Sequence, residues 1–574
     1  MTADVSAGLV AVAVAPDVGA AVVHPDGRVE QIAPSDAALR LAAIDADGAR
    51  WVWWDKATAT ALANLLVTPS RCWDLSAVHR LIHGGWRSGP EQVWAGAHGL
   101  DPATIPTLQP VDLFTQSVDS GDMEDPVGLD GHLRPEWVQG GWSDSMNRLS
   151  EWARLAADVQ RLQADRLAVR RDGESDARLR HRSTTALSES AAEILCAELE
   201  SHGLPFDRAV GEQIIEGFVG RRPLDAADEQ VALAELDAPV LAHLPPDATV
   251  DLRSPDQVKS LLRRAGIEVP DTRAWRLEAL RDDHPVVDAL LTWRRAERIR
   301  TTFGFGWLDE HVGDDGRLRG RWSGSDGAAG RMTATAGLHN MPSEMRPAIA
   351  AEADHVFVRA DLGQIEPRVL AAVSGDARLA AATQEDDMYA PVAQRLRVGR
   401  DIAKVAVLGA MYGQTTGKGA EALRGLEREY PVAMGHLRAA DEAAQGGKDL
   451  WTYGGGRIAM SGNITDAMSD GDVRSRAAAR GRFGRNAIVQ GAAAEFFKTW
   501  AVLVRARGGA LGTRVVLCLH DELVVHTPSV AADETRRLVD GCLQEAAARW
   551  SPPSDAPVRF VADTSVIERW SQAK

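Results

Sequence analysis

The pattern of hydrophobic and polar positions changes twice along the chain. Up to about residue 160, short apolar runs at 9–15, 19–23 and 50–54 alternate with stretches of helical periodicity such as 57–67. This alternation predicts a mixed α/β domain. Residues 164–183 are charged and have no sustained apolar stripe. They predict the end of a helix followed by an exposed linker at a domain boundary.

A helical region follows, and two of its segments carry signals for helix ends. The first is predicted to begin at Ser190, which precedes Glu193 by the three residues of a capping box, and to end at Gly203. The second has the same signals in order, with Ser254 as cap, Pro255 in the first turn, Gln257 closing the box and Gly266 as the stop. From about residue 320 onward, apolar runs of strand and helix type mix again.

Composition adds limits to this picture. A chain of 574 residues with 45% hydrophobic residues predicts several globular domains. The net charge of -17 argues against a nucleic-acid partner unless cations cluster where phosphates would lie. The four cysteines form no metal or disulfide pattern, and the first residues contain no basic stretch or long apolar core. We therefore expect a cytoplasmic protein without a membrane segment.

Two segments place acidic residues at the ends of apolar strands. The run 355–360 leads to Asp361, and two apolar runs within 514–528 flank His520, Asp521 and Glu522. The second segment predicts a β-hairpin with acids at its tip. Carboxylates held rigidly at strand ends suit Mg²⁺, which prefers oxygen ligands in fixed geometry. Taken alone, each segment is equally consistent with an acid in a solvated turn.

A third segment, 399–414, predicts a helix with cations at one end of a face and apolar groups at the other. Arg400, Lys404, Leu408 and Tyr412 share this face at a spacing of four residues. A nucleoside triphosphate has the same polarity, with charged phosphates followed by a flat base. An ordinary amphipathic helix with a solvated basic edge would show the same pattern.

Taken together and in order, these segments resemble motifs A, B and C of family A DNA polymerases. They read DLGQIEPR, RDIAKVAVLGAMYG and HDE, and segments 291–303, 328–342 and 481–500 match further motifs of the family. The resemblance covers roughly residues 188–574. It implies a multi-domain α/β and α+β fold in which a ribonuclease-H-like domain precedes a right-hand polymerase. The implied domains are the exonuclease-like domain (1–165), a linker (166–187), the thumb (188–300), the palm (301–380 and 471–574) and the fingers (381–470).

The resemblance also implies the site. Asp361, Asp521 and the backbone carbonyl of Leu362 would bind two Mg²⁺ ions, for which Mn²⁺ is a possible substitute, and Glu522 and Lys404 would assist catalysis. The implied nucleotide-binding residues are Gln364, Glu366, Arg400, Lys404, Leu408, Tyr412 and His520. The implied DNA-binding residues are Arg294, Arg298, Arg331, Asn340, Arg482, Asn486 and Gln490. The expected partners are primer–template DNA and deoxynucleoside triphosphates, and the expected state is a monomer.

Several positions depart from the family pattern. Leu408 stands where the family commonly has Phe or Tyr, which predicts unusual sugar selectivity. Pro367 replaces a leucine in motif A and is tolerable only in the first turn of a helix. His339 replaces a glutamine, which puts minor-groove checking in doubt. None of these changes removes an implied metal ligand.

The N-terminal domain departs further. Its first strands lack the DxE pair of the exonuclease, His79 stands near a second expected acid, and Arg154 stands at the tyrosine of the third motif, where Asp158 survives. Asp74 is an outside candidate for another acid. Since two metals need several converging carboxylates, we predict an inactive exonuclease-like domain.

Two other interpretations stay open on the sequence. One is a nuclease whose polymerase half only holds DNA, and the missing acids argue against it. The other is a DNA-binding protein without catalysis, derived from a polymerase. RNA-dependent synthesis is a possible side activity, although Glu366, which resembles the family's steric gate, favours deoxynucleotides.

Overall fold

The computed structural model describes residues 8–108, 124–171, 174–244, 250–413, 420–460, 470–552 and 554–573. The contacts divide the chain into two compact units. The first comprises Met1–His202, Arg321–Ala334 and Asp354–Val566, and the second comprises Gly203–Gly320, Thr335–Ala353 and Ile567–Lys574. The predicted linker and fingers include 172–173, 414–419 and 461–469, which lie outside the described residues.

The first unit begins with a five-stranded sheet of order β3-β2-β1-β4-β5. Its strands are β1 (Leu9–Ala15), β2 (Gly19–Val23), β3 (Val29–Ile32), β4 (Arg50–Trp53) and β5 (Cys72–Asp74). Strands β1 to β3 are antiparallel, whereas β4 and β5 run parallel to β1. The predicted apolar runs thus form the central strands, and the arrangement agrees with the expected exonuclease-like domain.

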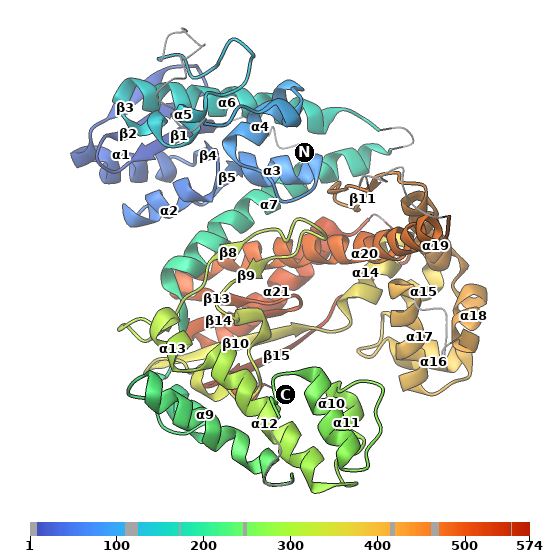
Figure 1. Cartoon of the computed structure of the whole chain (residues 1–574). Coiled ribbons are helices and arrows are strands. Elements are labelled where there is room, and N and C mark those ends of the chain that lie inside the picture. The colour runs from blue at the N-terminus through green and yellow to red at the C-terminus, as the bar shows by residue number, and fades with distance from the viewer. Residues whose placement is uncertain are drawn as a thin grey trace. The chain divides into compact units, whose positions relative to one another are not determined.

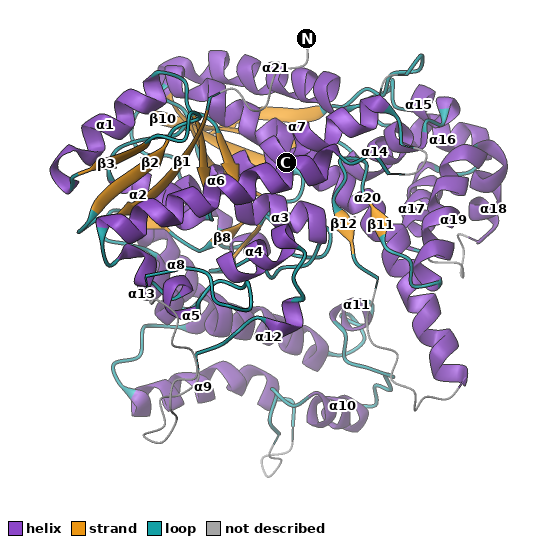
Figure 2. Cartoon of the chain, turned by 90° about the horizontal axis from the view of Figure 1, so that it is seen from above, coloured by secondary structure: helices purple, strands orange, loops and turns teal. Residues whose placement is uncertain are grey.

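Helices cover both faces of this sheet (Figure 2). They are α1 (Pro34–Ala46), α2 (Lys56–Asn64), α3 (Leu75–His83), α4 (Pro90–His98), α5 (Pro135–Val138) and α6 (Met146–Ala168). Side chains of β1 alternate between two cores, as the period of two in a strand requires. Val10 and Val12 pack with α1 and α2, whereas Ala11 and Ala13 pack with α3 and α6.

Helix α7 (Asp176–His202) occupies most of the predicted linker. The prediction that a helix begins at Ser190 is wrong, because Ser190 lies inside α7. Its hydroxyl donates to the carbonyl of Ala186 (2.7 Å) and accepts the backbone N–H of Asp74 (3.0 Å). The serine therefore satisfies the end of β5 rather than the end of a helix. Ile194 of the same helix packs into the core beneath β1 and β4.

The second sheet of the first unit has the order β13-β14-β10-β15. Its strands are β10 (His355–Leu362), β13 (Arg514–Cys518), β14 (Glu522–Pro528) and β15 (Ala562–Ile567). Strands β13 and β14 form the predicted hairpin, and β10 pairs antiparallel with β14. Helices α20 (Asp470–Gly508) and α21 (Ala532–Trp550) pack together beside this sheet (Figure 1).

A group of helices connects the strands of the second sheet. They are α14 (Ile365–Ser374), α15 (Ala377–Ala382), α16 (Tyr389–Leu396), α17 (Arg400–Tyr412), α18 (Ala420–Glu429) and α19 (Pro431–Gln445). The expected helix over 399–414 is confirmed as α17, and Pro367 lies in the first turn of α14, as predicted. Two short hairpins complete the unit, β8 (Trp322–Ser323) with β9 (Thr333–Ala334) and β11 (Leu450–Trp451) with β12 (Arg457–Ile458).

The second unit is mainly helical. Its elements are α8 (Arg208–Val219), α9 (Ala226–Leu241), α10 (Pro255–Arg264), α11 (Ala274–Glu278), α12 (Pro285–Phe303), α13 (Phe305–His311) and the strands β6 (Leu204–Pro205) and β7 (Arg317–Leu318). Ser254 caps α10 as predicted, and Gly266 follows that helix with a φ of 81°. Gln257, however, accepts from the backbone of Asp251 (2.9 Å) rather than closing a box on Ser254.

Within the part of the chain that the structure describes, one helix, Val473–Leu511, is long and apolar enough to cross a membrane by length and composition. Of its most apolar window, 78% is buried inside the protein, where it packs against α7, α19 and α21. Burial of this kind is typical of the core helix of a globular protein, so the apolar composition is explained by packing.

Candidate active site

The ends of β10 and β14 bring the acidic residues together. In the register of these strands, Asp361 lies opposite Glu522. The backbone N–H of Leu362 donates to the carbonyl of Asp521 at 2.7 Å, which extends the pairing one residue into the turn of the hairpin. The predicted strand end and hairpin tip therefore form one edge, and Asp361 and Asp521 are held there by backbone hydrogen bonds.

The electrostatics of this edge show that negative charge is crowded. Burial and the nearby charge of Asp521 raise the pKa of Asp361 to about 6, although Arg359 opposes the shift. Burial, and then the charge of Glu522, also raise the pKa of Asp521 above its ordinary value. Neighbouring carboxylates disfavour one another's ionised forms. A divalent cation would relieve this repulsion, so the chemistry of the two aspartates is compatible with a Mg²⁺ site, which stays a prediction.

Arg359, which the sequence reasoning missed, is the cation of this edge. It precedes Asp361 by two residues on β10, and its side chain is almost fully buried. Its Nη2 donates to Asp361 Oδ2 at 2.5 Å and to Glu522 Oε2 at 3.3 Å. The period of two in a strand places Arg359 and Asp361 on one face, which was the available signal.

A pocket of about 230 Å³ adjoins Asp521 and collects most of the expected nucleotide-binding side chains. Its lining includes Gln364, Glu366, Leu408, Tyr412, His520, Arg331 and Gln490. The hydroxyl of Tyr412 donates to Glu366 Oε2 at 2.9 Å, which fixes the carboxylate in the pocket. Burial, followed by the charge of Arg331, lowers the pKa of His520.

Two expected phosphate-binding cations lie outside that lining. Arg400 and Lys404 are exposed on α17, and Arg400 Nε donates to Asp387 Oδ2 at 2.6 Å. Asp387 also receives a hydrogen bond from Gln364 Nε2 at 3.5 Å. The structure thus joins the start of α17 to motif A through Asp387, a residue that the sequence reasoning did not single out.

Tyr389 is another lining residue that the sequence reasoning missed. It is 4% exposed, and burial, followed by the charge of Glu366, raises its pKa to about 12. The guanidinium of Arg400 lies 5.8 Å from the centre of its ring. A single tyrosine at the start of a short helix carries no pattern in the sequence that would have distinguished it from a core residue.

The expected DNA-binding residues fall into two groups. In the first unit, Arg331 Nη2 donates to Gln490 Oε1 at 2.9 Å, and Arg482 is exposed on α20. Asn486, which lies between Arg482 and Gln490 on α20, has a buried Oδ1 without a hydrogen-bond partner among the described residues. In the second unit, Arg298 Nη2 donates to the carbonyl of Asn340 at 3.0 Å, and Arg294 donates to the carbonyl of Thr272.

The N-terminal sheet has a cavity of its own, of about 790 Å³. Leu9 and Ala11 of β1 line it together with Asp158, Arg154 and Arg161 of α6, and Asp158 is paired with Arg161. The strand thus contributes aliphatic side chains to the cavity that contains the surviving acid.

The two other candidate residues of this domain have structural environments. Asp74 is fully buried, caps α3 through the N–H of Ala77 (2.8 Å) and accepts from Trp53 Nε1 (2.8 Å). Burial, followed by the nearby charge of His83, lowers the pKa of His79 to about 3. Neither side chain therefore offers an accessible charge.

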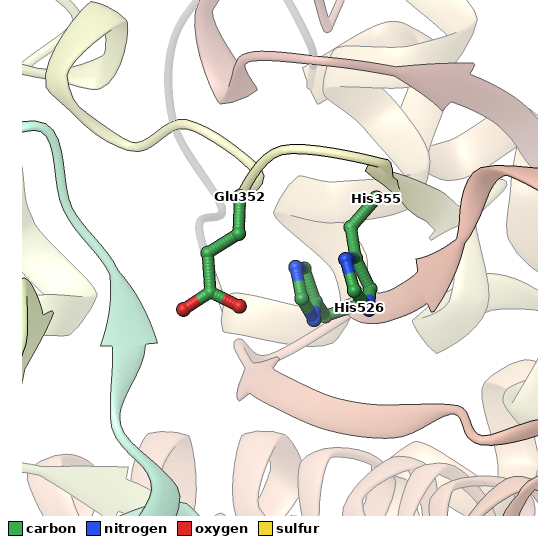
Figure 3. Close-up of side chains that lie close together, drawn as sticks. All are labelled: Glu352, His355 and His526. Atoms are coloured by element: carbon green, nitrogen blue, oxygen red, sulfur yellow. The ribbon is translucent and has the colours of Figure 1, made fainter.

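Two histidines stack at the far end of β10 from Asp361. The rings of His355 and His526 lie one over the other with centroids 4.5 Å apart and 6° between their planes (Figure 3). Glu352, also drawn there, belongs to the second unit. His355 and Asp361 are six residues apart, which in a strand is roughly 20 Å. The histidine stack is therefore separate from the edge formed by Asp361, Asp521 and Glu522, which is called the carboxylate edge below.

Comparison with known proteins adds the family. Residues 229–432 match the family model of DNA polymerase family A. The chain is 31% identical to DNA polymerase I of Chloroflexus aurantiacus over 294 residues, 46% of this chain and 30% of that protein. It is 30% identical to the thermostable DNA polymerase I of Thermus filiformis over 331 residues, 52% of this chain and 38% of that protein. The match thus spans about a third of the length of these relatives.

A solved structure extends the likeness to nearly the whole chain. The POL domain of Pol1 from M. smegmatis, in complex with DNA primer-template and dNTP, superposes with a TM-score of 0.68 at 23% identity. The superposition covers 99% of this chain and 97% of that one. The chain therefore has the fold of a polymerase domain. Together with the family model and the relatives, this confirms the resemblance to family A DNA polymerases.

Proposed function

We propose that the chain is a template-directed DNA polymerase that adds deoxynucleotides to the 3′ end of a primer. The observation that carries the proposal is the convergence of Asp361 and Asp521 beside the pocket that contains Glu366 and Tyr412. An acidic edge next to a pocket with a fixed carboxylate suits a substrate that joins a triphosphate to a sugar.

The chain's own residues would divide the work as follows. Two divalent ions, Mg²⁺ or in its place Mn²⁺, would be held by Asp361, Asp521 and the Leu362 carbonyl, and would neutralise the charge that develops in phosphoryl transfer. Glu366, fixed by Tyr412, would exclude a ribose 2′-hydroxyl, and Leu408 would shape the sugar side of the pocket. Arg400 would bind phosphate oxygens after leaving Asp387, and Lys404 would donate a proton to the pyrophosphate.

Several finer points go with this proposal. The thumb, palm and fingers would follow the ranges inferred from the sequence, and the N-terminal domain would be an inactive exonuclease. The protein would act as a cytoplasmic monomer in replication or repair. Arginines on α20 and α12 would contact the duplex backbone, which predicts DNA binding that weakens steeply as salt rises.

The test is primer extension on primed DNA with Mg²⁺ and all four deoxynucleotides, comparing wild type with Asp361→Asn and Asp521→Asn. We expect extension by wild type and a loss of at least about a thousandfold in each variant. Wild-type protein that binds primer–template but does not extend it would contradict the proposal and favour a DNA-binding protein without catalysis.

A further inference from the structure

The carboxylate edge contains a permanent positive charge that its proposed chemistry does not use. Arg359 is 5% exposed, so its guanidinium is held by protein groups rather than by water. Strand β10 lies between β14 and β15, and each of these neighbours presents an acid to Arg359. Glu522 Oε1 lies 3.3 Å from Nε, and Asp563 Oδ2 lies 3.9 Å from Nη1.

The contacts of Arg359 divide the acids of the edge. Its Nη2 bonds only one carboxylate oxygen of Asp361, Oδ2, at 2.5 Å. Its contacts with Glu522 involve both oxygens of that carboxylate, and Glu522 is buried. Among the described residues, no hydrogen bond or ion pair joins Asp521 to Arg359. Glu522 is thus committed to the arginine, whereas Asp521 and one oxygen of Asp361 remain for another cation.

We propose that Arg359 is a built-in counter-charge that sets the affinity of this edge for divalent cations. The inference rests on the proposed function, because it takes Asp361 and Asp521 as the metal ligands. A guanidinium stays protonated at every working pH. Its positive charge, a few ångströms from the ligands, repels a divalent ion and weakens binding. Arg359 also restrains Glu522, which would otherwise be able to move toward the metal.

Arg359 is therefore a positioning residue with a specific signature. An arginine that only supported the fold would change stability but not the intrinsic metal affinity. A counter-charge must change the metal affinity when it is removed, and it must do so without DNA or nucleotide.

The experiment measures Mn²⁺ binding to the full-length chain by electron paramagnetic resonance, and Mg²⁺ binding by calorimetry, without DNA or nucleotide. Arg359→Met removes the charge while keeping the length of the side chain, and Arg359→Lys keeps the charge. We expect Arg359→Met to bind the metal about tenfold more tightly or better, and Arg359→Lys to stay within about threefold of wild type. Unchanged or weaker binding in a folded Arg359→Met variant overturns the proposal.

The matched control is Arg505→Met. Arg505 lies on α20 in the same unit with its side chain 9% exposed, and it pairs with Glu198 at 2.6 Å and with the carbonyl of Pro69 at 2.9 Å. Its removal takes this ion pair from Glu198 of α7, which is not one of the acids of the carboxylate edge. We expect wild-type metal affinity, and a tenfold change in this variant too would show that the effect is not specific to Arg359.

Loss of Arg359 can also unfold the protein, because the buried carboxylate of Glu522 then loses its ion pair with the guanidinium. That case is decided by circular dichroism in EDTA and in rising Mg²⁺. Refolding at millimolar Mg²⁺ supports the proposal, since the metal then replaces the missing charge. A variant that stays unfolded at every Mg²⁺ concentration overturns it.

Primer extension by wild type is scored separately. If wild type neither extends primers nor binds metal, the proposed function fails; if it does both and Arg359→Met binds no better, only this inference fails.

Discussion

Each of the two sheets of the first unit adjoins a cavity, but the side chains that line the two cavities differ in kind. In the second sheet, Asp361 near the end of β10 pairs with Glu522 at the start of β14, and Arg359 and the adjoining pocket surround them with polar groups. In the N-terminal sheet, β1 presents Leu9 and Ala11 to a larger cavity in which Asp158 is paired with Arg161. The comparison teaches that two sheets of one unit can each adjoin a cavity while only one of them brings several carboxylates together beside it.

The largest expected effect comes from returning an acid to the N-terminal sheet. Ala11 is buried in the core between β1 and α6. Ala11→Glu should lower the free energy of unfolding by about 3 kcal/mol, because a larger, charged side chain must be accommodated at a packed position of β1 and loses part of its hydration there. Urea denaturation followed by circular dichroism measures the change. Ala42→Glu, at an exposed position of α1, is the control and should stay within about 0.5 kcal/mol of wild type. A mild effect of Ala11→Glu would mean that this sheet still tolerates carboxylates.

The opposite change in the second sheet should stabilise. The folded state raises the pKa of Asp361 to about 6, so ionisation of this group opposes folding above that pH. Asp361→Asn should therefore raise the free energy of unfolding by about 1–2 kcal/mol at pH 7.5 in EDTA, allowing for solvent screening at a partly exposed group.

The sign of this effect gives it a pH signature. As pH falls through 6, wild-type Asp361 takes up a proton in the folded state, and the advantage of the variant shrinks. Below about pH 4, the aspartate is neutral in both folded and unfolded states, and the two proteins should be equally stable. A gain that persists at pH 3.5 would mean that charge repulsion is not its cause.

A smaller effect is expected from removing the hydrogen bond by which Tyr412 holds the carboxylate of Glu366 in the pocket. Tyr412→Phe removes the 2.9 Å hydrogen bond to Glu366. A neutral donor to a charged group contributes about 1 kcal/mol, so discrimination against ribonucleotides should fall by about fivefold. Single-turnover incorporation of rATP and dATP measures it. Tyr430→Phe is matched, because the buried Tyr430 hydroxyl has no hydrogen-bond partner in the part of the chain that the structure describes. Equal discrimination in all three proteins would remove this role from Tyr412.

The last substitution, at Asp158, is expected to have no effect on activity. Asp158→Ala should change neither primer extension nor the removal of 3′ nucleotides, because one acid paired with Arg161 cannot hold two metals. A metal-dependent exonuclease activity of wild type that disappears in Asp158→Ala would restore chemical function to the N-terminal cavity.

The sequence predicted those features that depend on local pattern. The alternating runs of β1 and β2, the hairpin of β13 and β14, the helix α17 and the place of Pro367 all follow from periodicity or from the limits of single residues. The carboxylate edge was found because its acids stand at the ends of apolar strands. The order of the motifs then joined segments that are far apart in the chain.

Features that depend on register or on tertiary partners were missed. Arg359 reaches Glu522 only because β10 and β14 pair with Asp361 opposite Glu522, and no spacing in one strand specifies its neighbour. Ser190 has the spacing of a cap but satisfies the N–H of Asp74 from inside a helix. Tyr389 lines the pocket from the start of α16, and Asp387, in the loop before α16, binds Arg400 of α17. In each case, the same residues in another fold would have other partners.

Helix α7 ties the N-terminal sheet and its helices to the rest of the first unit. Glu193 of this helix pairs with Arg80 of α3, while Glu189 and Glu198 pair with Lys498 and Arg505 of α20. Helix α7 thus contributes side chains to the packing of both α3 and α20. A shortened chain that starts near residue 176 would keep every proposed catalytic residue but leave Ile194 and Glu193 facing water. A chain shortened in this way would therefore expose core residues of α7 to solvent and lose stability.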